Sequence, residues 1–255
     1  MSRRRIRLIT EGFPEPPTRD TAVSHAILRR VSDGLDPETL RLHRPGDVVA
    51  FGPKDRLAPG FGAAIEAARS AGFGSVLRLA GGRAAVFTTE SVAFSWAVPS
   101  PDPRAGIRAR FEELAAIVAG ALQDLGIDAR VGEVPGEYCP GEHSVNAGGL
   151  TKLMGVGQRL VQRAAHVGGV LIVDRADRVR DVLAPVNRAL DLVWDPDTAG
   201  SVAAERPGVT WDQAAHSILA RFARSYELEE GSVSRDTLAL AARLEPRHLA
   251  RAGRS

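Results

Sequence analysis

The chain has 255 residues, of which 44% are hydrophobic, enough for a substantial buried core. Its 33 lysines and arginines nearly balance its 31 aspartates and glutamates, and this net charge of +2 does not indicate a nucleic-acid-binding protein. One cysteine excludes an internal disulfide, and no apolar segment follows the basic start MSRRRIRLIT as in a signal peptide or membrane span, so we expect a cytoplasmic protein with no membrane partner.

The first hundred residues are expected to mix short strands with two helices. A helix at residues 21–31 has an apolar stripe with Val23, Ala26 and Ile27, and an alanine-rich helix at 63–71 ends before Gly72. The expected strands are at residues 5–10, at 40–42 and 47–51 on either side of the turn at 44–46, at 75–79, and as a strand pair within 84–98.

The remaining sequence is expected to begin with the longest helix, at residues 103–125, which Gly126 ends. Glycine turns then separate short strands that we interpret as a small antiparallel sheet, at residues 129–131, 144–146, 151–153, 157–161 and 169–173. A helix at 177–190 contains Pro185, and two C-terminal helices follow, the first with a capping box from Thr210 to Gln213. Separate helices and adjacent strands favour an α+β fold with a mixed or antiparallel sheet and flanking helices.

Lysine is rare in this chain, since Lys54 and Lys152 are the only two among its basic residues. Lys152 lies in the glycine-rich segment GGLTKLMGVGQR. Ammonium and guanidinium groups differ in shape, hydration and ease of deprotonation, so they are not interchangeable at a reacting centre. Lys152 is therefore a candidate for an ammonium that stabilises negative charge on a carbonyl or phosphate oxygen, and a leftover surface lysine is the alternative.

A glycine pair between two arginines, Arg78-Leu-Ala-Gly81-Gly82-Arg83, follows one expected strand and precedes another. Phosphate loops of the dinucleotide and P-loop type need a following helix, so neither motif is present. A strand, glycine and strand arrangement lets a long ligand lie against the main chain, and either arginine would bind an anionic group. A hairpin turn with solvated arginines is the alternative.

Cys139 lies in the turn Tyr138-Cys-Pro-Gly-Glu-His143, which would place its thiol at the apex of a loop. A thiolate attacks acyl groups well, and His143 or Lys152 nearby would raise the reactive fraction. A lone inert cysteine is the alternative. No metal site is expected, because structural zinc needs four clustered ligands.

The order of these motifs resembles the lipoyl branch of the biotin and lipoate protein ligase superfamily. Its members have a strand, an arginine and glycine motif, a strand, a long helix and then a GxKxxGxxQR segment, which here is Gly149-Leu-Thr-Lys152-Leu-Met-Gly155-Val-Gly-Gln158-Arg159. The resemblance covers about residues 5–190. It implies a class II synthetase-like catalytic domain at residues 1–197, with 198–255 as a helical C-terminal extension of the same unit.

The resemblance also implies acyl transfer as the function. Cys139 would carry an octanoyl or lipoyl group as a thioester, Lys152 would stabilise the oxyanion, and a lysine of a lipoyl carrier domain would then attack. The implied substrate-binding residues are Arg78, Gly81, Gly82, Arg83, Gly149, Gly155 and Gln158. The partners would be carriers like the glycine cleavage H protein or a dehydrogenase E2 domain, or an acyl carrier protein, and the transient acyl group would be the only cofactor.

Two departures from the family pattern keep other readings open. Phe87 and Thr88 stand where the family usually has a His-Asp pair, and the sequence from Cys139 to Lys152 differs from the usual sequence of the family. One alternative is an ATP-dependent lipoate-protein ligase, which would need ATP and Mg²⁺ and use Lys152 without Cys139. The other is a non-catalytic relative that binds acylated carrier domains.

Overall fold

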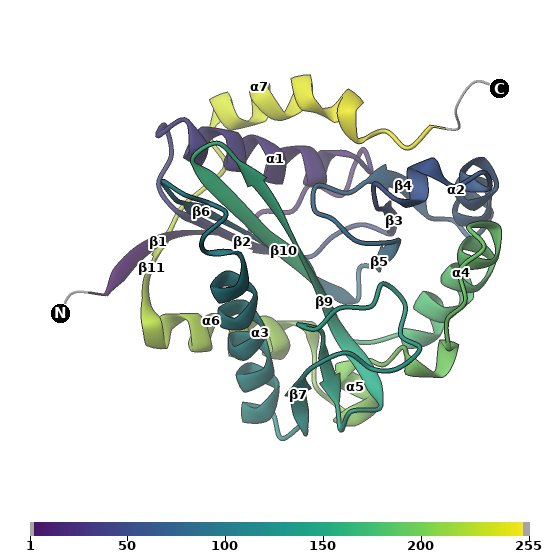
Figure 1. Ribbon diagram of the computed structural model, residues 1–255. Coiled ribbons are helices and arrows are strands. Elements are labelled where there is room, and N and C mark those ends of the chain that lie inside the picture. Colours follow the sequence, from purple (N-terminus) through teal and green to yellow (C-terminus); the bar gives the residue numbers. More distant parts are fainter. Residues whose placement is uncertain (1–2, 252–255) are drawn as a thin grey trace.

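Two sheets organise the computed structural model, which describes residues 3–251 (Figure 1). The larger sheet has eight strands, which in spatial order are β11 (Tyr226–Glu230), β1 (Arg4–Ile9), β2 (Thr39–His43), β6 (Ser91–Pro99), β10 (Ala164–Ile172), β9 (Thr151–Val161), β8 (Val145–Ala147) and β7 (Ala129–Val131). The pairs β11–β1 and β1–β2 are parallel, and every later pair is antiparallel. The expected α+β class with a mixed sheet is therefore confirmed.

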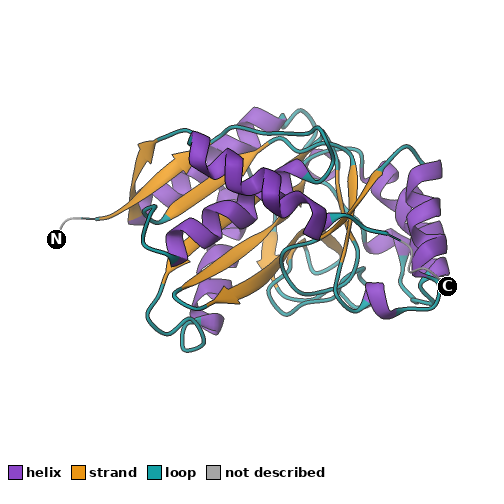
Figure 2. Cartoon of the chain, turned by 90° about the horizontal axis from the view of Figure 1, so that it is seen from above, coloured by secondary structure: helices purple, strands orange, loops and turns teal. Residues whose placement is uncertain are grey.

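The smaller sheet has three strands, in the spatial order β4 (Gly74–Leu77), β3 (Val48–Phe51) and β5 (Ala85–Phe87). β3 pairs with β4 in parallel and with β5 in antiparallel orientation. Seen from above, this sheet and two helices form one end of the molecule, and the long strands of the larger sheet extend toward the other end (Figure 2). The glycine pair Gly81-Gly82 lies between β4 and β5.

The helices cover the two faces of the larger sheet and one side of the smaller one (Figure 1). Their bounds are α1 (Arg19–Ser32), α2 (Phe61–Ser70), α3 (Ile107–Asp124), α4 (Ala176–Ala189), α5 (Val202–Glu205), α6 (Trp211–Ser225) and α7 (Arg235–Leu244), with short 3₁₀ turns η1 (Asp55–Leu57), η2 (Pro196–Thr198) and η3 (Glu245–His248). α1 and α7 pack together on one face, α3 and α6 pack together on the other, and α2 pairs with α4 beside the smaller sheet.

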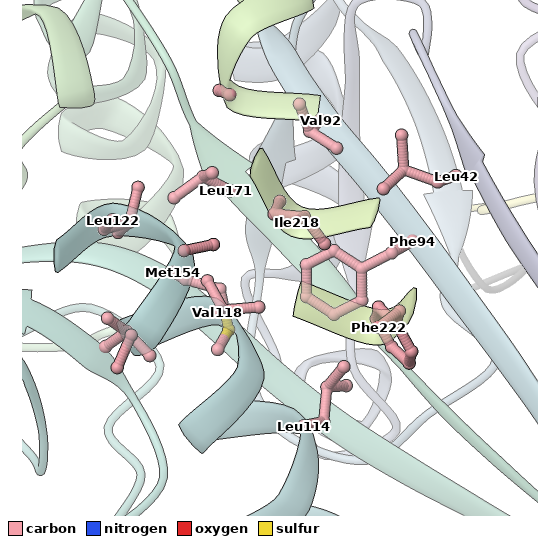
Figure 3. Close-up of a cluster of buried hydrophobic side chains, with 14 of the residues drawn as sticks. Leu42, Val92, Phe94, Leu114, Val118, Leu122, Met154, Leu171, Ile218 and Phe222 are labelled. Carbon is pink, nitrogen blue, oxygen red and sulfur yellow. The ribbon is translucent and has the colours of Figure 1, made fainter. Parts of the chain in front are cut away.

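The main core lies between the larger sheet and the α3–α6 pair (Figure 3). Its labelled members are Leu42, Val92, Phe94, Leu114, Val118, Leu122, Met154, Leu171, Ile218 and Phe222. Leu114, Val118 and Leu122 recur every four residues along α3, which gives this helix one buried face. The capping box at the start of α6 is also confirmed, since Thr210 and Gln213 exchange side-chain-to-backbone hydrogen bonds.

Strand pairing differs from the sequence-based expectation in three places. The strands after α3 do not form a sheet of their own but continue the larger sheet through β10 and β6. Residues 151–161 form one continuous strand, β9, rather than two strands split by glycines. Two strands that follow each other in sequence, at 40–42 and 47–51, belong to different sheets, and so do the two strands within 84–98. A short polar turn between two strands does not determine whether they pair with each other.

The C-terminal region contains a strand that the sequence did not predict. β11 has the sequence YELEE and pairs in parallel with β1 at the edge of the larger sheet. Glutamates on an edge strand protect it from pairing with another chain, but they also remove the apolar pattern that would reveal the strand. Among residues 3–251, no helix combines the length and the apolar character that crossing a membrane would require.

Candidate active site

A cavity of about 740 Å³ opens where the β4–β5 loop, the start of α3, the Cys139 turn and β9 meet. Seven of the nine predicted site residues line it: Arg78, Gly81, Gly82, Cys139, Lys152, Gly155 and Gln158. A smaller cavity of about 90 Å³ shares Arg78, Phe87 and Gly169 with it and extends between α1 and the larger sheet. Segments from Arg78 to Val170 thus form one site.

The sulfur of Cys139 lies against the glycine motif. It accepts a hydrogen bond from the Arg83 backbone N–H at 3.2 Å, and the Arg78 Nη1 atom is 3.6 Å away. Gly82 has a φ of +105°, and a Cβ there would lie 2.9 Å from the sulfur. A side chain at position 82 would therefore be strained and would push the thiol away from its donors.

Lys152 is a buried residue, which excludes the reading of a leftover surface lysine. Its side chain is 1% exposed. Its Nζ atom donates to Glu137 Oε1 at 2.9 Å, to the Tyr138 carbonyl oxygen at 2.9 Å and to the Cys139 carbonyl oxygen at 2.8 Å. An ammonium has three protons, so all of them are engaged by the Cys139 turn. Lys152 thus contacts the backbone of Cys139 rather than its sulfur.

Glu137 is the site residue that sequence reasoning missed. Its carboxylate is fully buried, and Oε1 accepts hydrogen bonds from the Gly141 N–H at 3.0 Å and the Ser144 hydroxyl at 2.7 Å as well as from Lys152. Oε2 accepts from the Val134 N–H at 3.1 Å. Glutamate is seldom buried unless it is paired, so only the three-dimensional contacts distinguish Glu137 from a surface residue.

The two arginines of the glycine motif have different roles in the structure. Arg78 lines both cavities, and its Nη1 donates to the Arg83 carbonyl oxygen at 2.9 Å. The Arg83 side chain pairs at 3.2 Å with the buried carboxylate of Asp55, which also accepts from the Gly52 N–H. Arg78 is therefore the arginine that a ligand in the cavity would meet, whereas Arg83 contributes its backbone.

Three further residues differ in where they lie. His143 lines the cavity, where its ring stacks on Phe111 with ring centroids 5.0 Å apart. Gly149 lies in the exposed turn between β8 and β9 and does not line the cavity. Gln158 does line it, but its amide donates to the Ile107 carbonyl oxygen at 2.6 Å and accepts from Arg110, so it joins β9 to α3.

Burial shifts the pKa values of two side chains that line the cavities, Tyr138 and His166. It raises the pKa of the Tyr138 hydroxyl well above its ordinary value, with Cys139 and Glu137 adding to the effect. It lowers the pKa of His166, in the smaller cavity, to about 3, so this imidazole is neutral at physiological pH. Among residues 3–251, no three histidines, cysteines, aspartates or glutamates are arranged to hold a metal ion.

Curated relatives share part of the chain. A protein of Oceanobacillus iheyensis named octanoyl-[GcvH]:protein N-octanoyltransferase is 25% identical over 67% of this chain and 62% of its own length. A protein of Exiguobacterium sp. with the same name is 30% identical over 53% of this chain and 49% of its own length. The chain thus spans about half to six tenths of the length of these relatives.

Solved structures share the fold. Lipoate-protein ligase A bound with ATP superposes with a TM-score of 0.77 at 21% identity, covering 97% of this chain and 95% of that one. A putative lipoate protein ligase from T. acidophilum with bound lipoic acid gives a TM-score of 0.74 at 22% identity, covering 97% and 96%. The model of one family, the lipoyl protein ligase A/B catalytic domain, matches residues 16–223. The chain belongs to this family, as the order of its arginine, glycine and lysine motifs predicted.

Proposed function

We propose that this chain transfers an octanoyl or lipoyl group between carrier proteins through a thioester on Cys139. The observation that carries the proposal is the position of the Cys139 sulfur. It borders the larger cavity, and two donor groups, the Arg83 N–H and the Arg78 guanidinium, point to it. These donors lie where the negative charge of a thiolate would sit, and a thiolate is the nucleophile in thioester formation.

The reaction would proceed in two balanced steps. In the first, the Cys139 thiolate forms a bond to the acyl carbon, the bond from that carbon to the donor's lysine nitrogen or thiol breaks, and the leaving atom takes a proton. In the second, the amine of an acceptor lysine attacks the thioester, loses a proton and regenerates the thiolate. Splitting the exchange lowers each barrier. The smaller cavity would take the acyl tail, since it continues from Arg78.

Lys152 is proposed to stabilise the oxyanion of each tetrahedral intermediate. Its three protons are engaged in the free protein, so the ammonium would exchange one backbone carbonyl for the substrate oxygen. The proposed partners are lipoyl carrier domains, in agreement with the names of the curated relatives. Thioester exchange needs no further cofactor, and ATP with Mg²⁺ would be needed only by the ligase reaction.

Intact-mass measurement tests the proposal directly. The protein is mixed with an octanoylated carrier, without ATP, and we expect the mass of one octanoyl group on the protein and then on a second carrier. Cys139→Ala should abolish both signals, while its thermal unfolding midpoint stays within a few degrees of wild type because Cys139 is only partly buried. Wild-type transfer by the Cys139→Ala variant would refute the thioester.

The same experiment separates the other two readings. Modification of a carrier that requires lipoate and ATP and survives Cys139→Ala would establish ligase chemistry in place of transfer. Binding of an acylated carrier without a mass change on either protein, with and without ATP, would establish a non-catalytic relative.

A further inference from the structure

We infer that Glu137 is the positioning residue of this site: its buried carboxylate fixes both the Cys139 turn and the Lys152 ammonium. The inference rests on the proposed function only where acyl transfer is the readout. In its full extent, residues 132–144 between β7 and β8, the Cys139 turn contains three glutamates, but only Glu137 is buried, at 3% exposure, while Glu133 and Glu142 are exposed. Burial of a carboxylate is costly unless several donors satisfy it, so the contacts of Glu137 need an explanation.

The contacts of Glu137 close the turn on itself. Val134 lies three residues before it and donates to Oε2, whereas Gly141 and Ser144 lie four and seven residues after it and donate to Oε1. One side chain therefore ties both arms of the turn together, and Cys139 lies between these arms. A group that accepts several hydrogen bonds from one loop holds it in a single conformation.

The Lys152 ammonium extends this network to the sheet. It lies on β9, which pairs with β10 and β8 in the larger sheet, and it bridges Glu137 to the carbonyl oxygens of Tyr138 and Cys139. The turn is thus fixed to a rigid element by an ion pair whose two side chains are 1% and 0% exposed. Removing one partner of such a pair leaves a buried charge without compensation.

The backbone at Cys139 shows what this network holds in place. Cys139 has a φ of +45°, in the left-handed region that side chains seldom adopt. Such a conformation persists only where the surrounding contacts enforce it. The contacts on both sides of Cys139 run through Glu137 and Lys152, and they direct the sulfur toward the Arg83 N–H. Loss of the carboxylate would let the turn relax and the sulfur leave its donors.

Alkylation by iodoacetamide measures this effect without any acyl donor. Cys139 is the only cysteine, so the alkylated fraction reports on this one sulfur. Glu137→Gln keeps the size of the side chain and removes its charge. We expect alkylation at pH 7 to slow roughly tenfold or more, because the reactive sulfur loses its donors, and octanoyl transfer to fall at least as much through kcat rather than KM.

Two matched variants separate positioning from general stability. Glu133→Gln removes an exposed carboxylate from the same turn and should leave alkylation and stability unchanged. Glu38→Gln removes a buried carboxylate that accepts from Trp96 and pairs with Arg4, outside both cavities. It should lower the thermal unfolding midpoint but keep alkylation of the folded protein within about twofold of wild type.

A folded Glu137→Gln variant whose alkylation is not slowed would overturn the inference. Should this variant fail to fold, Ser144→Ala tests the same network more gently, since it removes one donor to Oε1. Its expected effect is a two- to tenfold slower alkylation, and wild-type alkylation there would also overturn the inference. Slowed alkylation without any acyl adduct on the wild-type protein would support Glu137 as the positioning residue and reject the acyl-transfer proposal alone.

Discussion

Two buried cations fasten loops to the larger sheet, and they do so with different chemistry. Arg41 on β2 is 0% exposed and holds the segment before and at the start of α1. Its guanidinium donates to the carbonyl oxygens of Glu11 and Asp20, to the Ser24 hydroxyl and to the Asp20 carboxylate. Lys152 on β9 holds the Cys139 turn through one carboxylate and two carbonyls.

The difference lies in what each loop carries. The loop held by Arg41 bears no cysteine, and a planar fork of five donors spans its several acceptors. The turn held by Lys152 carries the only cysteine in a left-handed conformation, and its three acceptors converge on one point. A compact ammonium suits convergent acceptors, and in the proposed function it would exchange one of them for a substrate oxygen. The same anchoring device thus holds a wall of the smaller cavity in one place and the turn that carries the cysteine in the other.

The largest expected effect comes from exchanging the cation at the site. Lys152→Arg keeps the charge, but a planar guanidinium cannot fill the position of Nζ without displacing the Cys139 turn, since the side chain is 1% exposed and its Nζ atom lies between three acceptors of that turn. We expect octanoyl transfer to fall roughly 100-fold. Rates of acyl-adduct formation on folded protein, with circular dichroism as the folding check, would measure it. Wild-type rates in this variant would show that only charge matters at position 152.

Sequence alone predicts the parts of this site that depend on residue type and order. The arginine and glycine motif, the lysine segment and the cysteine can be recognised because their residue types and spacing are visible in the sequence, and their order predicts the family that the match shows. The hydrogen-bond and ion-pair partners of these residues cannot be predicted from the sequence. Glu137 looks like either neighbouring glutamate in the sequence, and only folding places Lys152 beside it. The sequence points to His143 or Lys152 as the group that raises the reactive fraction of Cys139, whereas the hydrogen-bond donors to its sulfur in the structure are Arg83 and Arg78.

The fold shows the same division between local and distant information. Periodicity predicts α3 and α6 because each buries one face against the sheet. It does not predict that β2 and β3, four residues apart, belong to different sheets. A glycine can also be mistaken for a turn. Gly157 lies inside β9, and a Cβ at this position would lie 3.0 Å from the Cβ of Ala80. It therefore marks a close approach rather than a turn.

A smaller effect on transfer, and a larger one on stability, is expected at the structural cation. Arg41→Lys leaves three donors for a wider set of acceptors, so some buried oxygens lose their hydrogen bonds. We expect a loss of about 2 to 4 kcal/mol in the free energy of unfolding. Urea denaturation would measure it, and acyl-adduct formation by the folded variant should fall less than about fivefold. A 100-fold loss of transfer would remove the distinction between the two anchors.

The smallest expected effect is a pH dependence at the Arg41 anchor. His43 lies 3.4 Å from Asp20, and burial lowers the pKa of its imidazole from 6.5, with the Arg41 charge adding to the effect. The neutral imidazole is therefore favoured in the folded state. The free energy of unfolding is highest above pH 6.5 as far as His43 is concerned, and it falls as the pH drops below 6.5, because the unfolded chain then binds a proton that the folded protein excludes. The pKa of Asp20 is itself lowered, because its contacts with His43 and Arg41 outweigh its burial, so the carboxylate stays charged where the imidazole titrates in the unfolded chain. As the pH falls below 6.5, His43→Gln should reduce the slope of unfolding free energy against pH by up to about 1.4 kcal/mol per unit. Equal slopes of unfolding free energy against pH, measured by urea titration of the wild type and of His43→Gln, would contradict this. The other buried histidines are present in both proteins, so their contributions cancel in the difference.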